Sequence, residues 1–240
     1  EDRLAALTSR PPAVADPADP VPLDGDVVSV DGVAAAWGDR VVLDDLDLHL
    51  TPGERVAVVG PTGSGKSTLA ALLMRFVDPV RGAVRLGSHR LPELALGDVR
   101  GTVGLVDDDP HVFASTLAEN VRLARPSATD DEVEGALRQA RLGGWLDSLP
   151  DGLDSWLGDG HAQVSGGERA RIAIARSLLA DQPVLVLDEP AAHLDGATAD
   201  ELAAEVLGRP DDGAGDRTVV WITHAEAGLD RVDRVLDLGR

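Results

Sequence analysis

The strongest chemical signal in the sequence is a glycine-rich segment that ends in a lysine and two hydroxyl side chains. It satisfies the pattern G-x-x-x-x-G-K-[ST], and such a loop binds polyphosphate through backbone amides and the N-terminus of the helix that follows. Lys66 is the only lysine among 22 basic side chains. We expect it to neutralise the β- and γ-phosphates of a nucleotide, while the Ser67 hydroxyl binds Mg²⁺. The alternative is a glycine turn at the start of an ordinary helix, but this does not explain the position of the single lysine. The segment consists of Gly60, Pro61, Thr62, Gly63, Ser64, Gly65, Lys66, Ser67 and Thr68.

Two adjacent carboxylates follow an apolar run over residues 184–187. Such a run predicts a buried strand, and open α/β sheets bind ligands at the carboxyl ends of their strands. We expect Asp188 to hold Mg²⁺, directly or through water, and Glu189 to orient or deprotonate the attacking water. Alone, the pair is equally consistent with a turn at the end of a strand. Together with the phosphate loop, it indicates nucleotide hydrolysis.

The elements that must position these residues follow an α/β pattern. Residues 1–24 are rich in proline and predict an extended, poorly packed linker. Residues 25–240 read as one domain, with short strands of a small antiparallel sheet first and a mostly helical stretch over about 96–179. Strand signals return after that stretch, and the alternation predicts a mixed or parallel sheet flanked by helices.

Composition excludes several classes of protein. The net charge of -20 argues against a nucleic-acid partner, because phosphate binding needs a basic surface. The chain has no cysteine, so thiol chemistry and disulfides are absent. No apolar run is long enough to cross a bilayer. If the protein works at a membrane, we expect another segment or chain to span it.

A second glycine-containing segment precedes the carboxylate pair. Ser165 and Glu168 match a capping box, so a well-capped helix is the simple interpretation. Two glycines in a first turn cost helix stability, however, and leave the backbone open to a phosphate. With this segment the sequence resembles the ABC ATPase family. The resemblance implies that the segment contacts the γ-phosphate held by a second subunit, in a head-to-tail dimer around two ATP molecules. The segment consists of Val164, Ser165, Gly166, Gly167 and Glu168.

Other family features follow in order over residues 27–240. Trp37 stands where the family places an aromatic that stacks on adenine, although a core position in the small sheet would also explain it. His224 matches the histidine that contacts the γ-phosphate. Residues 191–195, ending at Asp195, match the loop that crosses to the partner subunit.

Two segments resemble exporters rather than importers. Residues 112–121 are similar to the segment that follows the glutamine loop of exporters. Residues 157–163 are similar to the exporter loop that touches the membrane domain. Its usual Glu-Arg pair is replaced by Asp159 and Gly160, so we expect that contact to differ. The exporter resemblance implies that the proline-rich residues 1–24 are the linker from a membrane domain.

The sequence departs from the family at its glutamine and at its signature. Asp108 replaces the glutamine that binds Mg²⁺ and senses the membrane domain, whereas Glu168 and Val164 replace a glutamine and a leucine. A carboxylate still ligates Mg²⁺ but adds negative charge near the triphosphate. Such altered sites are common in heterodimeric exporters. Residues 106–113 and 190–195 resemble one subunit of the heterodimeric cysteine/glutathione (thiol-reductant) exporters linked to cytochrome bd assembly.

We therefore expect a P-loop NTPase fold of ABC type and the ATP-hydrolysing motor domain of an exporter, with ATP and Mg²⁺ bound. The expected partners are a transmembrane domain, in the same chain or a separate subunit, and a second ABC domain from a different subunit. The expected location is the cytoplasmic face of the plasma membrane. Two alternatives stay open. One is a regulatory half of an asymmetric dimer with weak hydrolysis, and the other is a soluble ABC ATPase without a transport role.

Overall fold

An antiparallel sheet occupies the N-terminal part of the computed structural model, which describes residues 12–158, 164–192, 194–208 and 217–239. Its strand order is β2-β1-β4-β5. The long strands β1 and β2 are joined by a tight turn in which Gly38 has φ 59°. Apolar side chains of both strands face inward, and their polar neighbours face solvent. The strands are β1 (Val28–Trp37), β2 (Arg40–Leu50), β4 (Arg81–Leu86) and β5 (His89–Arg90).

A parallel sheet forms the centre of the domain, with strand order β6-β7-β8-β3-β9. All residues of β7 and β8 are buried, which explains their continuous apolar sequences. Side chains of β7 alternate between two apolar clusters. Val184 and Val186 face one, and Leu185 and Leu187 face the other. The strands are β3 (Arg55–Val59), β6 (Val103–Val106), β7 (Val184–Asp188), β8 (Thr218–Ile222) and β9 (Arg234–Asp237).

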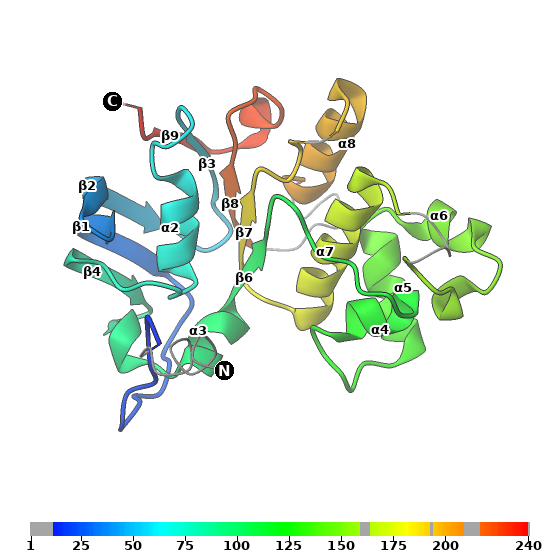
Figure 1. Cartoon of the computed structure of the whole chain (residues 1–240), viewed down its shortest axis with the longest axis horizontal. Helices are drawn as coiled ribbons and strands as arrows, with labels where there is room; N and C mark the ends of the chain where they lie inside the picture. The colour runs from blue at the N-terminus through cyan, green and yellow to red at the C-terminus, as the bar shows by residue number, and fades with distance from the viewer. Residues whose placement is uncertain (1–11, 159–163, 193, 209–216, 240) are drawn as a thin grey trace, which may run out of the picture.

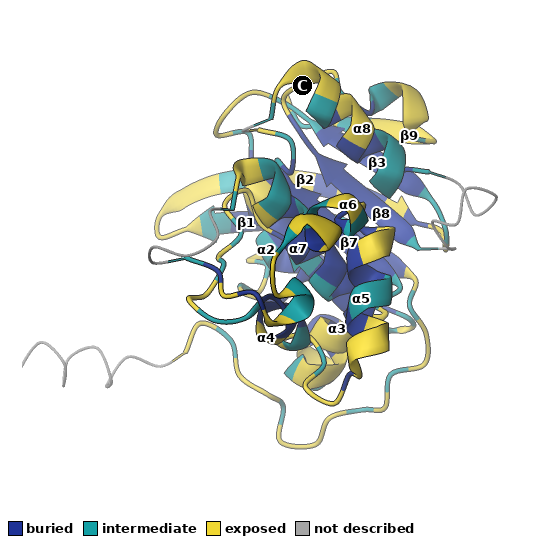
Figure 2. Cartoon of the chain, turned by 90° about the vertical axis from the view of Figure 1, so that its right-hand side faces the viewer, coloured by how far each residue is buried: buried dark blue, intermediate teal, exposed yellow. Residues whose placement is uncertain are grey.

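Helices cover the two faces of the parallel sheet differently. Helix α2 lies between the two sheets, whereas α4 to α7 form a group on the other side of the parallel sheet (Figure 1). The central strands β7 and β8 are buried between these layers, whereas the edge strand β9 and the outer helix faces are exposed (Figure 2). The helices are α2 (Lys66–Leu73), α3 (Leu96–Thr102), α4 (Leu117–Arg122), α5 (Asp130–Gln139), α6 (Gly143–Ser148), α7 (Gly166–Ala180) and α8 (Gly196–Val206), with 3-10 turns η1 (Leu91–Glu93), η2 (Gly152–Asp154) and η4 (Leu229–Arg231). No helix of the described ranges is long and apolar enough to span a membrane.

The structure changes one expectation about local structure and adds contacts to another. Strand β6 lies inside the stretch predicted to be mostly helical and belongs to the parallel sheet. Residues 12–24 contain no helix or strand and none of them is buried, as expected for an extended segment, but their backbone is attached to the domain. Their backbone is held by the buried Arg75, whose guanidinium donates to the Ala15 carbonyl at 2.8 Å, and by Val21 N–H, which donates to Glu93 O at 3.0 Å. Residues 1–11 of the predicted linker lie outside the described residues.

Candidate nucleotide-binding site

The phosphate loop connects the end of β3 to the start of α2, as predicted. Three of its glycines have positive φ, namely Gly60 at 150°, Gly63 at 84° and Gly65 at 102°. A Cβ at Gly65 would lie 2.4 Å from a methyl carbon of Leu43 in β2. Glycine is therefore required there for two reasons, backbone conformation and close packing.

Lys66, Glu189 and His224 meet at the end of this loop. The Lys66 ammonium donates to the Gly60 carbonyl at 2.8 Å and lies 3.7 Å from Oε1 of Glu189. Oε2 of Glu189 lies 2.8 Å from Nδ1 of His224. Glu189 itself has φ 50°, a left-handed backbone that carries its carboxylate past the end of β7. The three predicted catalytic residues are thus brought together.

Asp188 lies beside the Ser67 hydroxyl, which hydrogen bonds to its carboxylate. Burial raises the pKa of Asp188, and the nearby Glu189 and Asp108 carboxylates act in the same direction. Its Oδ1 is buried without a hydrogen-bond partner. A buried free carboxylate oxygen next to a hydroxyl fits Mg²⁺, which usually takes one or two carboxylates and completes its shell with phosphate and water. In the described part of the chain, no three His, Cys, Asp or Glu side chains are arranged to hold a metal alone.

Asp108 lines the same cavity from the loop after β6, as the predicted position of the altered glutamine requires. Burial raises the pKa of its neighbour Asp107, with Asp108 and Asp109 adding to the effect. Asp109 instead pairs with Arg169 of α7 at 3.6 Å. The cavity has a volume of about 360 Å³. It is lined by Val42, Thr62, Gly63, Gly65, Lys66, Ser67, Thr68, Asp108, Glu189, Ala192 and His224.

Trp37 ends β1 next to the phosphate loop and is 54% exposed. The alternative of a core residue is therefore wrong. Its indole N–H donates to the Thr68 hydroxyl at 3.0 Å. An ordered, exposed aromatic ring beside a phosphate loop is suited to stacking on a base.

The signature segment does not line this cavity. Ser165 caps α7, with its hydroxyl accepting from Glu168 N–H at 3.3 Å and the Glu168 carboxylate accepting from Ser165 N–H at 2.7 Å. The predicted capping box is therefore confirmed. Gly166 lines a separate cavity shared with Asp108. Asp195 caps α8 through Thr198, and the hydrogen bonds from Thr198 lower its pKa.

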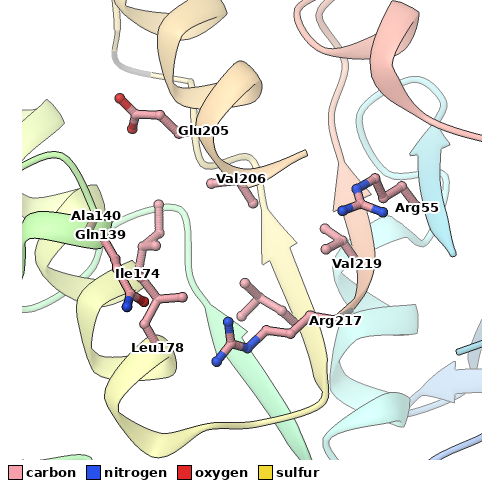
Figure 3. Close-up of a pocket in the computed structure, with 10 residues that line it drawn as sticks. Arg55, Gln139, Ala140, Ile174, Leu178, Glu205, Val206, Arg217 and Val219 are labelled. Carbon is pink, nitrogen blue, oxygen red and sulfur yellow. The ribbon is translucent and has the colours of Figure 1, made fainter. Parts of the chain in front are cut away.

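A third, smaller cavity lies on the side of the parallel sheet that faces α7 and α8 (Figure 3). Its volume is about 50 Å³, which accommodates a few waters but no nucleotide. Leu185 and Val219, near the starts of their strands, form its floor. It is thus distant from the carboxyl ends of the strands, where the phosphate loop and Glu189 lie.

One buried network was not found from the sequence. Arg176 of α7 donates to the Asn120 and His111 carbonyls, each at 2.8 Å. Asn120 is 1% exposed and donates through its amide to the Phe113 and Thr116 carbonyls, each at 3.0 Å. The network ties the loop before α4 to the helix that begins at the signature. In the sequence, only the polar residue Asn120 within the segment 112–121 could have indicated this network.

Comparison with known proteins agrees with this geometry. A family model described as an ABC transporter matches residues 43–192. The chain is 41% identical over 201 residues to an ATP-dependent lipid A-core flippase of Burkholderia pseudomallei (strain 1710b), covering 83% of this chain and 33% of the flippase. It is 42% identical over 225 residues to the mycobactin import ATP-binding/permease protein IrtA of Mycobacterium tuberculosis (strain ATCC 25618 / H37Rv), covering 91% of this chain and 26% of IrtA.

A solved structure has the same fold. It is a bacterial Atm1-family ABC exporter with ATP bound, with a TM-score of 0.86 and 32% identity, and the match covers 100% of this chain and 42% of that one. The chain therefore spans a third or less of the two curated relatives described above. The antiparallel sheet, parallel sheet and helical group confirm the predicted fold class.

Proposed function

Because the chain belongs to the ABC transporter family, we propose that it is the ATP-binding and ATP-hydrolysing motor domain of an exporter. The observation that carries the proposal is the position of the Glu189 carboxylate, held between Lys66 and His224 at the carboxyl end of the parallel sheet. These two side chains are the donors that a γ-phosphate would need. A γ-phosphate bound to them would leave Glu189 beside the water that attacks it.

The residues of the site have separate roles in ATP binding and hydrolysis. Trp37 stacks on the base, and the loop amides with Lys66 neutralise the phosphates. Ser67 and Asp188 would hold Mg²⁺, with Asp108 as a further oxygen donor, and the ion would neutralise charge on the β- and γ-phosphates. Glu189 accepts a hydrogen bond from water and aligns it for in-line attack, and His224 steadies the γ-phosphate.

The active unit is proposed to be a head-to-tail dimer. Ser165 and Gly166 are exposed and lie outside the cavity of their own phosphate loop, so they are free to contact a nucleotide on a second domain. Asp108, Glu168 and Val164 depart from the family pattern, which supports a different second subunit. The thiol-reductant exporter resemblance rests on residues 106–113 and 190–195, and neither curated relative described above is named for that cargo.

The proposed setting is the cytoplasmic face of the membrane. The relatives are much longer than this chain, which supports a transmembrane domain in the same full-length protein or a separate subunit. The exporter-type loop and the loop to the partner subunit include residues 159–163 and His193, which lie outside the described residues. The alternative of a weakly hydrolysing regulatory half is favoured by one observation, the Asp108 carboxylate in the cavity.

Mg-ATP turnover of the full transporter, or of the chain mixed with its second ABC domain, tests this proposal. Glu189→Gln should reduce turnover at least about 100-fold while ATP still binds, because the catalytic acceptor is lost. Glu226→Gln is the matched control, since Glu226 is exposed and has no side-chain hydrogen bond or ion pair within the described chain. Equal turnover of Glu189→Gln and wild type would refute the mechanism.

A further inference from the structure

Trp37 is an exposed aromatic whose only polar atom is bonded to the phosphate-loop helix. More than half of the residue is exposed, yet its indole N–H donates to the hydroxyl of Thr68 at 3.0 Å. Thr68 is 6% exposed and lies in the first turn of α2, two residues after Lys66. The two residues are 31 positions apart in the chain.

This hydrogen bond contributes little to the stability of the fold. An exposed N–H can bond to water, so exchanging water for Thr68 gains little stability. The bond does fix the orientation of the indole ring, because it anchors the N–H edge while the backbone anchors the Cα. By contrast, the buried indole N–H of Trp221 has no hydrogen-bond partner in the described structure. The fold thus leaves a buried indole unsatisfied and gives a partner to an exposed one.

A second contact joins the same two parts of the fold. Leu43 of β2 packs onto Gly65, directly before α2. The turn between β1 and β2 is therefore attached to the phosphate loop on one side by apolar packing and on the other by the Trp37–Thr68 hydrogen bond. The two contacts together hold the end of β1, where Trp37 lies, at the phosphate loop.

We propose that Thr68 is a positioning residue that holds the Trp37 ring ready for a nucleobase, at a fixed spacing from the phosphate loop. The inference rests on the proposed function and names the side chain that orients the ring on which the base would stack. A ring already held in place loses less rotamer freedom when a base stacks on it, which improves affinity by about two- to tenfold. The Thr68 hydroxyl orients the Trp37 ring and does not itself contact the base.

A double-mutant cycle on ATP affinity tests the proposal. Calorimetric titration of Mg-ATP into the folded chain would compare wild type, Thr68→Val, Trp37→Phe and the double variant. Thr68→Val removes the acceptor, and Trp37→Phe keeps a ring but removes the donor. Each single variant should bind ATP about two- to tenfold more weakly, and Thr68→Val should cost less affinity in the Trp37→Phe background than in wild type. Thr68→Ser keeps the hydroxyl and should recover most of the affinity that Thr68→Val loses.

The possible outcomes separate this inference from the proposed function. Fully additive losses would show that Thr68 acts directly on the nucleotide and would overturn the inference while leaving ATP binding intact. Wild-type affinity in Trp37→Phe would overturn it as well, even where Thr68→Val does not fold. A folded wild-type chain that binds no ATP would overturn both.

Discussion

Replacing Gly65 by alanine should destabilise the domain more than the same replacement at Gly63. Both glycines have positive φ, 102° and 84°, so a Cβ costs roughly 1–2 kcal/mol of backbone strain at either. Around Gly63 nothing lies within 4 Å of the added carbon, whereas at Gly65 it would meet Leu43 at 2.4 Å and the Val42 carbonyl at 3.2 Å. Overpacking of this kind adds about 1–3 kcal/mol.

We therefore expect Gly63→Ala to lower the free energy of unfolding by about 1–2 kcal/mol and Gly65→Ala by about 2–5 kcal/mol. Urea unfolding without nucleotide, followed by circular dichroism, measures both values. The cycle with Leu43→Ala isolates the steric part, since the double variant should lose less stability than the two single variants summed. Equal losses at Gly63 and Gly65 would refute the packing argument.

Three further predictions concern the capping box, the altered glutamine position and a half-buried carboxylate. Ser165→Ala should lower the free energy of unfolding by about 1 kcal/mol, because it removes the cap of α7; no change in urea unfolding would contradict this. Asp108→Gln should strengthen ATP binding a few-fold at low salt and less at high salt, because a charge near the triphosphate is removed. Calorimetry at two salt concentrations tests this, and a salt-independent affinity change would speak against it. Burial raises the pKa of Glu205 although Arg171 lies 3.6 Å away. The unfolded chain then binds fewer protons above pH 4.5, so stability falls as pH rises through that window. Glu205→Gln should reduce the fall in thermal unfolding temperature with rising pH. A pH profile identical to that of wild type would contradict this explanation.

The chemical residues could be predicted because each lies next to a strong local signal. The loop ending in Lys66 follows an apolar strand, and Asp188 and Glu189 end another, so the parallel sheet brings them together whatever the rest of the chain does. The capping box at Ser165 is equally local. Trp37 needed the resemblance to the family, since an aromatic at the end of a strand is most often part of a core.

Elements without a local signal were missed. Strand β6 has four residues, one of them glycine, which is too short for periodicity to distinguish it from the neighbouring helices. Helix α2 ends at Leu73, although the apolar sequence that follows Lys66 continues to Phe76. Arg75 there adopts φ 48° and buries its guanidinium against the segment 12–24. Such long-range contacts cannot be predicted from the spacing of residue types along the sequence.

The central claim, that the phosphate loop binds ATP through Lys66, is tested most directly by calorimetric titration of Mg-ATP into wild type and Lys66→Ala. The account predicts one ATP per wild-type chain and an affinity about 10- to 100-fold lower for Lys66→Ala, because charge-assisted contacts to the phosphates are lost. Arg231→Ala removes an exposed positive charge elsewhere and should bind as wild type does. Undiminished ATP binding by folded Lys66→Ala would contradict the account.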